Sequence, residues 1–539
     1  MSGSITLENR FGVNKMELIS LKYAIFVIVL LVLYYCFPKK YRWYVLLAGS
    51  MAYYVIICKW YVLFIIFTIC TTYGSTIWID KLLKKQNAIV KSHKEDWDRQ
   101  TRKEYKEKGR KKRVAVMLFA LLCNFGILAF LKYIPYADEL GLLLPLGISF
   151  YTFQSMGYVM DVYREIVEPE KNFLKVALFV SFFPQIIQGP IAIYDKLAGQ
   201  LYEGHSLRLE NLQKGALLVL WGVMKKLVIA DRAVNIINFV MDKPMDFSGT
   251  YVFFAAVVYA LQLYADFSGG IDIVRGIAEM FGITMSTNFN HPYFSRSLTE
   301  YWHRWHMTLG DWCRNYIFYP LSISKRFLNF GKWLKPRFGA HISKVLPGCI
   351  ASVITFIVIG VWHGANMKYL YFGLWNGIVI MLAELFAPVN KKVAGGFFKL
   401  TGLREKGIFA TIVSVLWTFM LILVGYYFDI AANASTAFHM LFKSVTDFHI
   451  SELGINNIIL NLGACGLDEY DILLLIICTL LWFFISFVEE NKKLDMRDFI
   501  LSRKLPLRWA IIYLGIFIVI IFGYYGPGVN PADFVYMQF

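Results

Sequence analysis

The sequence predicts an all-α, polytopic integral membrane protein, and three observations lead to that prediction. Of the 539 residues, 57% are hydrophobic and only 17% are charged. The mean hydropathy is +0.51, whereas soluble domains carry far more charge. Apolar stretches long enough to cross a bilayer as helices recur along the whole chain. We therefore expect about 11 to 13 membrane segments, some of them re-entrant, in a single integral domain over residues 1–539.

The candidate segments follow one another without an internal repeat or a low-complexity linker. The first, near residues 20–37, follows basic residues as the apolar region of a signal peptide does, but Pro38-Lys39-Lys40 stands where a cleavage site would lie. We expect this segment to be retained. The others lie near residues 43–79 (room for two), 114–134, 142–160, 173–191, 212–230, 250–266, 345–365, 369–387, 408–429, 471–488 and 509–524.

The formal net charge of +17 is concentrated in one segment. Residues 81–113 hold 14 Lys and Arg against 5 Asp and Glu, and so contribute +9. An excess of basic residues marks cytoplasmic loops, so we expect a solvated cytoplasmic loop and no nucleic-acid partner. Attraction of this loop to anionic lipid or to an anionic donor is the alternative.

Charge also predicts the orientation of the later loops. Residues 322–344 carry six basic residues and no acid, 389–406 carry five against one, and 491–508 carry six against two. Residues 431–469 carry one Lys and four acids. We expect the first three loops in the cytoplasm, and the 431–469 loop and the C-terminus outside the cell.

Metal and disulfide chemistry find little support in the sequence. The eight cysteines are scattered, without a Cys-x-x-Cys pair, which argues against a disulfide framework and a zinc ribbon. Glu300, His303 and His306 stand at i, i+3 and i+6, a spacing that turns the third side chain away from the first. We expect no metal site.

The stretch YWHRWHMTLGDWCRNYIFYP (residues 301–320) holds two histidines among aromatic residues. On a helical wheel its aromatic side chains fall within about a 100° arc, which predicts one amphipathic helix with an aromatic stripe. His306 lies at the edge of that stripe and is expected to be half-buried. His303 points into the polar face and is expected to be solvated. A structural hydrogen bond or a headgroup contact is the alternative role for either histidine.

A second candidate, His363, ends a run of nearly twenty apolar residues. Ionisable groups at membrane depth are costly, which makes this histidine a functional candidate, with a purely structural role as the alternative. Low dielectric leaves a neutral ring that can accept a proton. Polar clusters also interrupt the apolar sequence at residues 144–154, 183–191 and 264–276, where freed backbone groups line protein or a cavity. There Asp266 is either a helix cap or a cavity-lining carboxylate.

Taken in order, these segments resemble the membrane-bound O-acyltransferase (MBOAT) superfamily, in the bacterial branch typified by the alginate O-acetylation protein. The resemblance covers roughly residues 140–380 and the C-terminus. The matching segments are LPLGISFYTFQSMGYVMDVYR, FFPQIIQGPI, YADFSGG, NFNHPYFSRSLTEYWHRWHMTLGDWCRNYIFYPL, GVWHGA and YYGPGVNPADFVYMQF. It implies an MBOAT-like multi-helix fold with a central tunnel and catalytic core motifs in residues 140–380.

The resemblance also implies the site residues. His363 matches the family's invariant histidine, and His306 matches the histidine of an Arg-Trp-His motif. Relatives commonly have Arg in place of His303 and Tyr or a similar residue in place of Gly270, so substrate specificity does not carry over. The expected catalytic residues are His363 and His306. Candidates for lining the tunnel or contacting substrate are Arg304, Trp305, Asp266, Ser268, Gln185, Asn290 and Trp362.

The implied reaction moves an acyl group, most often acetyl, from a cytoplasmic thioester such as acetyl-CoA to hydroxyls of a cell-envelope polysaccharide. We expect His363 to deprotonate the acceptor hydroxyl, and His306 to orient the donor or stabilise charge. A straight span from residue 345 separates the two histidines by roughly 27 Å of helix rise, which favours a tunnel entered from both sides. Direct transfer is mildly favoured over a covalent intermediate.

Two other functions are compatible with the sequence. One is D-alanyl transfer from a carrier protein to teichoic acid, and the other is a proton-coupled transporter that uses His363 and Asp266. For the acyltransferase we expect no permanently bound cofactor. We expect a bacterial cytoplasmic membrane location in contact with the lipid bilayer. The resemblance also implies an extracytoplasmic or membrane-anchored acyltransferase partner, and the 431–469 loop lacks a serine-centred motif of its own.

Overall fold

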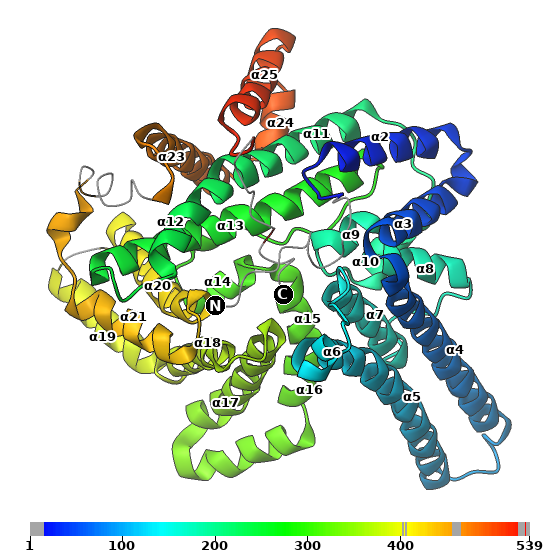
Figure 1. The fold of residues 1–539 in the computed structure, drawn as a ribbon. Coiled ribbons are helices and arrows are strands. Elements are labelled where there is room, and N and C mark those ends of the chain that lie inside the picture. The colour runs from blue at the N-terminus through cyan, green and yellow to red at the C-terminus, as the bar shows by residue number, and fades with distance from the viewer. Residues whose placement is uncertain are drawn as a thin grey trace. The chain divides into compact units, whose positions relative to one another are not determined.

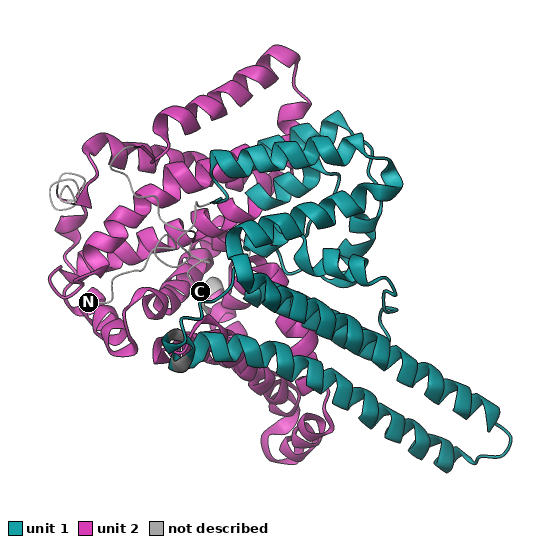
Figure 2. Ribbon diagram, turned by 45° about the vertical axis from the view of Figure 1, so that its right-hand side comes forward, with its two compact units in different colours: residues 1–219, 273–286 teal, residues 220–272, 287–539 magenta. Residues whose placement is uncertain are grey.

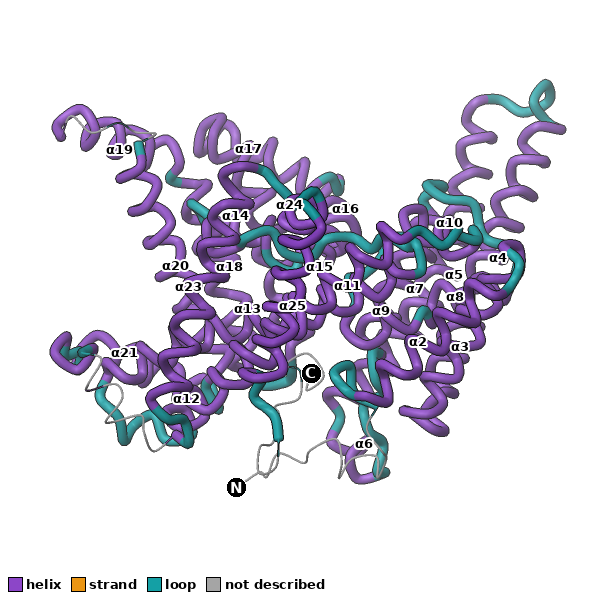
Figure 3. The backbone as a smooth tube through the Cα atoms, turned by 90° about the horizontal axis from the view of Figure 1, so that it is seen from above, coloured by secondary structure: helices purple, strands orange, loops and turns teal. Residues whose placement is uncertain are grey.

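A computed structural model describes residues 16–401, 404, 407–454, 457, 465–526 and 534. Their regular structure consists of helices joined by loops (Figure 3), which confirms the all-α fold. Among the described residues, seven helices are long and apolar enough to cross a membrane, or eight if one bent pair forms a single span. The other apolar segments expected from the sequence also form helices, but these are shorter or less apolar than a full span requires.

The helices pack into two compact units, coloured teal and magenta in Figure 2. Unit 1 is Met1–Val219 with Ile273–Ser286, and unit 2 is Leu220–Asp272 with Thr287–Phe539. The division falls inside two helices, α11 (Leu209–Met224) and α13 (Gly249–Met280). The expected single domain over residues 1–539 stays a prediction.

Unit 1 contains a long antiparallel hairpin of α4 (Val62–Ser92) and α5 (Arg99–Tyr133) (Figures 1 and 2). The basic segment 81–113 forms the distal part of this hairpin, and α5 begins where the Asp98 side chain accepts a hydrogen bond from the Thr101 amide at 2.9 Å. The apolar parts of both helices pack on α7 (Ile148–Tyr163), which is almost wholly buried. The remaining elements are α2 (Leu21–Cys36), η1 (Lys39–Tyr41), α3 (Arg42–Cys58), η2 (Lys59–Tyr61), α6 (Pro135–Glu139), α8 (Phe173–Ser181), α9 (Phe183–Gln188) and α10 (Tyr194–Tyr202).

Unit 2 contains both candidate histidines. Its elements are the π-helical η3 (Lys225–Ala230), α12 (Asp231–Met241), the first part of α13, η4 (Pro292–Phe294), α14 (Leu298–Arg304), α15 (Met307–Cys313), the π-helical η5 (Arg314–Phe318), α16 (Tyr319–Ser322), α17 (Lys325–His363), α18 (Met367–Leu385), α19 (Ala387–Thr401), α20 (Ile408–Ile430), α21 (Ala434–Thr446), η6 (Ile450–Leu453), α23 (Glu469–Lys492), α24 (Met496–Leu501) and α25 (Leu505–Phe522). Within this unit α19 and α24 lie at one end and α21 at the other (Figure 3). The basic and acidic loops are thus separated as their charges predict, while which end faces the cytoplasm stays a prediction.

The end of α17 is fixed by close packing against α18. The chain reverses at Gly339 (φ 80°), and the apolar part of α17 then runs to His363. A Cβ on Gly360 would lie 2.2 Å from the Tyr369 carbonyl oxygen, and one on Gly373 would lie 2.3 Å from the Phe356 carbonyl oxygen. Glycine therefore lets the two backbones touch, as in many membrane helix pairs, and this contact sets the position of His363.

Alanine at Gly373 should destabilise this helix pair. The added methyl group must displace the carbonyl of Phe356, at an expected cost of about 1–3 kcal/mol, which lowers the melting temperature of the detergent-purified protein. Gly348→Ala in α17 is the matched control, because no atom lies within 4 Å of the added Cβ. That variant should melt at the same temperature or slightly higher, because alanine favours helix. Equal melting temperatures for the two variants would contradict the packing argument.

Candidate active site

The two histidines line one pocket of unit 2. The lining residues come from α13, α14, α15, α17, α18 and α20 and from the α14–α15 junction. They are Leu263, Tyr301, Trp302, Trp305, His306, Leu309, Ile359, His363, Phe372, Asn376, Ile422, Tyr426 and Asp429. The cavity of about 20 Å³ has room for one water-sized group. The expectation that a straight span separates the histidines is therefore wrong, because α14 and α15 bring His306 to the end of α17.

His306 occupies a break between two short helices. The expected single helix over residues 301–316 is wrong, because α14 ends at Arg304 and α15 begins at Met307. His306 has φ 42° and ψ 52°, a left-handed conformation that costs a non-glycine residue roughly 1–2 kcal/mol. Its side chain is only 2% exposed, so it is buried rather than half-buried. His303 is exposed, as predicted.

Asn288 holds the His306 ring in one orientation. The Asn288 Oδ1 atom accepts hydrogen bonds from the Thr308 amide at 3.1 Å and from the Thr308 hydroxyl at 2.9 Å. An amide N–H can only donate, so the atom that faces it is the oxygen of the Asn288 side chain. The same oxygen lies 3.1 Å from His306 Nδ1, which must therefore carry a hydrogen.

The His306 ring is neutral in this setting. Burial, and to a smaller extent the nearby His363, lower the pKa of His306 to about 3. With its hydrogen on Nδ1, the neutral ring carries its lone pair on Nε2. His306 can therefore accept a hydrogen bond from a ligand in the pocket. It does not offer a donor to a developing oxyanion.

Asn288→Leu should impair activity through His306. The substitution removes the oxygen that fixes the ring, and leaves the Thr308 amide and hydroxyl without their acceptor. Because the ring then no longer presents Nε2 in one orientation, we expect acyl transfer to fall about ten- to a hundredfold, a rise in the barrier of about 1.4–2.7 kcal/mol. Asn238→Leu, at an exposed position in α12, is the matched control and should transfer at the wild-type rate. Wild-type activity in the Asn288 variant would show that Asn288 has no role in acyl transfer.

His363 lies in an aromatic surround at the end of α17. Its ring is edge-on to Trp362 at 4.9 Å and to Phe372 at 5.4 Å, and it stacks on Tyr369 at 5.8 Å. Trp362 in turn lies 6.3 Å from the His306 ring, between centroids. His363 is half-buried, whereas Trp362 is buried. Three ring contacts limit the rotation of His363 and hold it at the pocket.

Three tyrosines form a directed chain of hydrogen bonds in the pocket wall. The Tyr293 hydroxyl donates its single hydrogen to the Ala260 carbonyl at 2.6 Å. The Tyr426 hydroxyl, 3.1 Å away, must therefore donate to Tyr293. By the same reasoning the Tyr301 hydroxyl donates to Tyr426 at 2.8 Å. The chain ties α14 and η4 to α20 and α13.

Asp266 and Ser268 belong to a buried ionic cluster. The Lys226 ammonium contacts Asp266 at 2.7 Å and Asp231 at 2.8 Å. The neighbouring Lys225 donates to the Ser268 hydroxyl at 2.9 Å. Asp266 lies within α13, so the helix-cap interpretation is wrong. Neither Asp266 nor Ser268 is among the residues that line the histidine pocket, so their candidacy as tunnel-lining residues stays a prediction.

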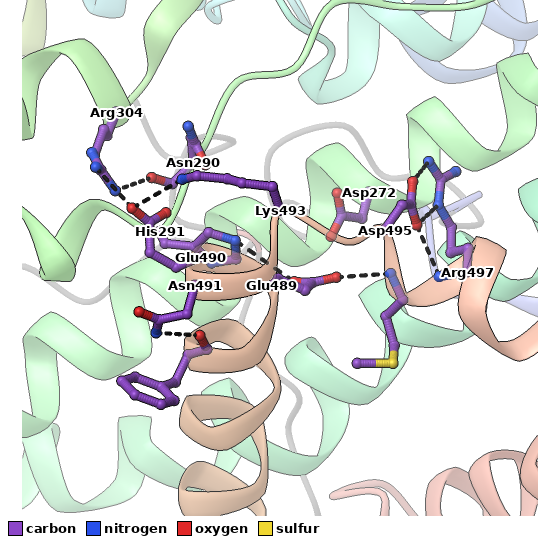
Figure 4. A network of polar contacts seen from close by, with 12 residues as sticks. Asp272, Asn290, His291, Arg304, Glu489, Glu490, Asn491, Lys493, Asp495 and Arg497 are labelled. Atoms are coloured by element: carbon purple, nitrogen blue, oxygen red, sulfur yellow. Dashed lines mark hydrogen bonds and ion pairs between the residues drawn. The ribbon is translucent and has the colours of Figure 1, made fainter.

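Arg304 fixes the end of α14 and lies outside the pocket lining. It pairs with Glu300 at 2.7 Å. It also pairs with Glu490 of α23 at 3.1 Å (Figure 4). The Arg304 carbonyl accepts the amide of Asn290 at 2.9 Å, while the Asn290 side chain is exposed. Figure 4 also shows Lys493, which contacts Glu490 at 3.4 Å. Arg304 and Asn290 therefore hold the backbone around His306, while Trp305 itself lines the pocket.

Gln185, the remaining candidate, lies in unit 1. It is buried and donates to the Gln154 side chain and, at 2.9 Å, to the Pro190 carbonyl. These bonds hold the FPQIIQGPI segment in place. A direct role of Gln185 toward substrate stays a prediction.

The sequence prediction missed two residues that bear on the chemistry of the site. Asp429 is the one acidic side chain among the described lining residues, and Asn288 binds His306. Asp429 ends the apolar run of α20, and an ionisable residue in that position is a signal that the sequence does contain. Within the part of the chain that the structure describes, no three His, Cys, Asp or Glu side chains are placed to hold a metal ion.

The fold and the site define a class of protein, namely an all-α, multi-pass membrane protein with two histidines in one buried pocket. The sequence model of the MBOAT, membrane-bound O-acyltransferase family, matches residues 169–335, which include His306. A probable alginate O-acetylase of Pseudomonas syringae is 30% identical over 58% of this chain and 54% of its own length. A peptidoglycan O-acetyltransferase of Helicobacter pylori is 30% identical over 51% of this chain and 56% of its own.

A third relative is a teichoic acid D-alanyltransferase of Bacillus subtilis, 26% identical over 52% of this chain and 67% of its own. The chain spans little more than half the length of the first two relatives. These similarities support a member of the MBOAT superfamily, in the branch that resembles the alginate O-acetylases.

Proposed function

We propose that the chain is a membrane acyltransferase that carries acetyl from a cytoplasmic thioester, acetyl-CoA or another acyl thioester, toward hydroxyls of a cell-envelope polysaccharide. The observation that carries this proposal is the meeting of His306 and His363 in one buried pocket. Relatives named as O-acetylases and O-acetyltransferases support the class of reaction.

The chemistry requires a base beside the acceptor oxygen. A hydroxyl is a poor nucleophile at neutral pH, so His363 takes its proton as the oxygen attacks the thioester carbonyl carbon. The carbon–sulfur bond then breaks, the oxygen–acyl bond is complete, and the proton passes to the leaving thiolate. His306 accepts a hydrogen bond at Nε2 and orients the donor or the acceptor. Direct transfer and transfer through an acyl-enzyme intermediate both need this base.

The dimensions of the pocket favour a short acyl group. Aromatic side chains leave a cavity of about 20 Å³, and the ring contacts of His363 restrict its expansion. Acetyl needs the smallest displacement of these walls. A long fatty acyl chain would require the aromatic walls to separate.

The surroundings of Arg304 indicate where the donor enters. The network in Figure 4 lies at the C-terminal end of α23, next to the 491–508 loop whose charge predicts a cytoplasmic location. The donor would therefore approach His306 from this side, and the acceptor from the side of the 431–469 loop. The C-terminus would then face outward, and an extracytoplasmic or membrane-anchored acyltransferase partner would complete the transfer.

Mass spectrometry of envelope polymers tests the proposal. A strain that lacks the gene should lose O-acetyl esters from one polysaccharide and regain them when the gene is restored. Loss of D-alanyl esters with retention of acetyl esters would overturn the acetyl assignment. It would support the second candidate, D-alanyl transfer from a carrier protein to teichoic acid, which similarity to the Bacillus subtilis relative favours.

The transporter alternative has less structural support. Its proposed relay pairs His363 with Asp266, but Asp266 is bound to Lys226 and is absent from the pocket lining. Transport predicts flux of substrate through proteoliposomes without any acyl donor. Donor-dependent ester formation predicts no such flux.

A further inference from the structure

Asp429 is an ionisable residue in the histidine pocket that neither the sequence motifs nor the proposed roles of the histidines explain. It lies next to the last residue of α20 and is the one carboxylate among the described lining residues. Charged groups at membrane depth are costly, and they persist where they pair with a partner or serve a function.

The carboxylate of Asp429 is held by a neighbour on another helix. The Tyr259 hydroxyl of α13 donates to Asp429 Oδ2 at 2.7 Å, a charge-assisted bond. The Lys368 ammonium donates to the backbone carbonyls of Asp429 at 2.8 Å and Ala431 at 2.7 Å. Lys368 thereby provides hydrogen bonds to C-terminal carbonyls of α20, and its positive charge stabilises the negative end of that helix dipole.

The same contacts connect Asp429 to His363. The Lys368 ammonium lies 4.8 Å from the centre of the Tyr369 ring, and Tyr369 stacks on His363 at 5.8 Å. Lys368 and Tyr369, at the start of α18, thus hold the end of α20 beside the imidazole of His363. Asp429 and His363 both line one cavity, which is large enough for a single water-sized group.

We propose that Asp429 is a positioning residue that acts through His363, by balancing the positive charge that forms when the imidazole takes the acceptor's proton. This inference rests on the proposed role of His363 as base. In a pocket with little water, a carboxylate stabilises an imidazolium far more than it would in solvent. The Tyr259 hydroxyl holds the carboxylate in place through its hydrogen bond to Oδ2. The proton itself moves only between the acceptor, His363 and the leaving thiolate.

Asp429→Asn tests the charge while keeping the shape. We expect kcat for acyl transfer to fall about ten- to a hundredfold, with KM for the thioester donor within about twofold of wild type. Asp429→Glu should restore most of kcat, because it restores the charge. Glu469→Gln, which neutralises an exposed acid at the start of α23, is the control and should leave kcat unchanged.

Each outcome decides one question. A wild-type kcat in Asp429→Asn, or failure of Asp429→Glu to recover activity, would overturn the proposal. A lower melting temperature with no loss of kcat would show that Asp429 only stabilises the fold, and would overturn it as well. If Asp429→Asn does not accumulate, Tyr259→Phe is measured instead, because it removes the hydrogen bond to the Asp429 carboxylate and leaves the carboxylate itself. This variant should lower kcat about fivefold at constant KM. An unchanged kcat would overturn the proposal. His363→Ala is measured in parallel: full activity in that variant refutes the proposed function itself, whereas its inactivity beside an active Asp429→Asn refutes only this inference.

Discussion

A His363→Ala variant should accumulate in the membrane at the wild-type level and lose acyl transfer by at least about a hundredfold. A positioned general base contributes about 10²- to 10⁴-fold, so its removal raises the barrier by at least about 3 kcal/mol. The imidazole ends α17 and is half-buried, which leaves the Gly360 and Gly373 packing of that helix intact. The measurement is ester formation per unit of membrane protein, with abundance checked by immunoblot.

An exposed histidine in the same unit provides the control for this variant. His439 of α21 is solvent-exposed, so His439→Ala should keep full activity. If His363→Ala also kept full activity at normal abundance, His363 would not be the base. The proton would then have to go to another group in the pocket.

His306→Asn should also abolish most activity while preserving the local fold. Asparagine tolerates the left-handed backbone at this position, and its side-chain amide can donate to Asn288 much as His306 Nδ1 does. The variant thus keeps the structural bond and loses Nε2 with its lone pair. We expect a loss of about 10²-fold, because the donor or the acceptor is no longer oriented by a hydrogen bond to Nε2.

His303→Asn is the matched control for this second variant. His303 is exposed three residues earlier, and its replacement should leave transfer unchanged. An active His306→Asn protein would show that His306 serves only to close the helix break through Asn288. A poorly accumulating His306→Asn protein, rescued by His306→Gln, would point to packing at the buried position instead.

The all-α fold and the importance of the two histidines could be predicted from the sequence, because each is marked by a local pattern of residues. Long apolar runs predict spans, and a titratable residue at the end of one run identifies His363. Asp429 carries the same signal at the end of α20, so it was predictable by the same reasoning. The resemblance to a family added His306, which periodicity alone placed only at the edge of an aromatic stripe.

The geometry around His306 could not be predicted, because it depends on a break between α14 and α15 that the spacing of the aromatic residues does not reveal. The aromatic residues keep a helical spacing across residues 301–316, although the backbone leaves the helix at Trp305 and His306. Only this break brings His306 Nδ1 to Asn288, eighteen residues earlier in the chain. The pairing of Asp266 with Lys226 likewise joins residues forty positions apart, which no local pattern reveals.

The directed chain of hydrogen bonds leaves the three tyrosine hydroxyls able to act only as acceptors toward a ligand. The phenolic hydrogens of Tyr301, Tyr426 and Tyr293 are all donated within the protein, and the Trp302 indole N–H is donated to Asn376 at 3.0 Å. His306 Nε2 and the Asp429 carboxylate are acceptors as well. These groups therefore receive hydrogen bonds from the O–H and N–H groups that a ligand brings. A sugar hydroxyl or the amide of a thioester carrier arm can supply such a group.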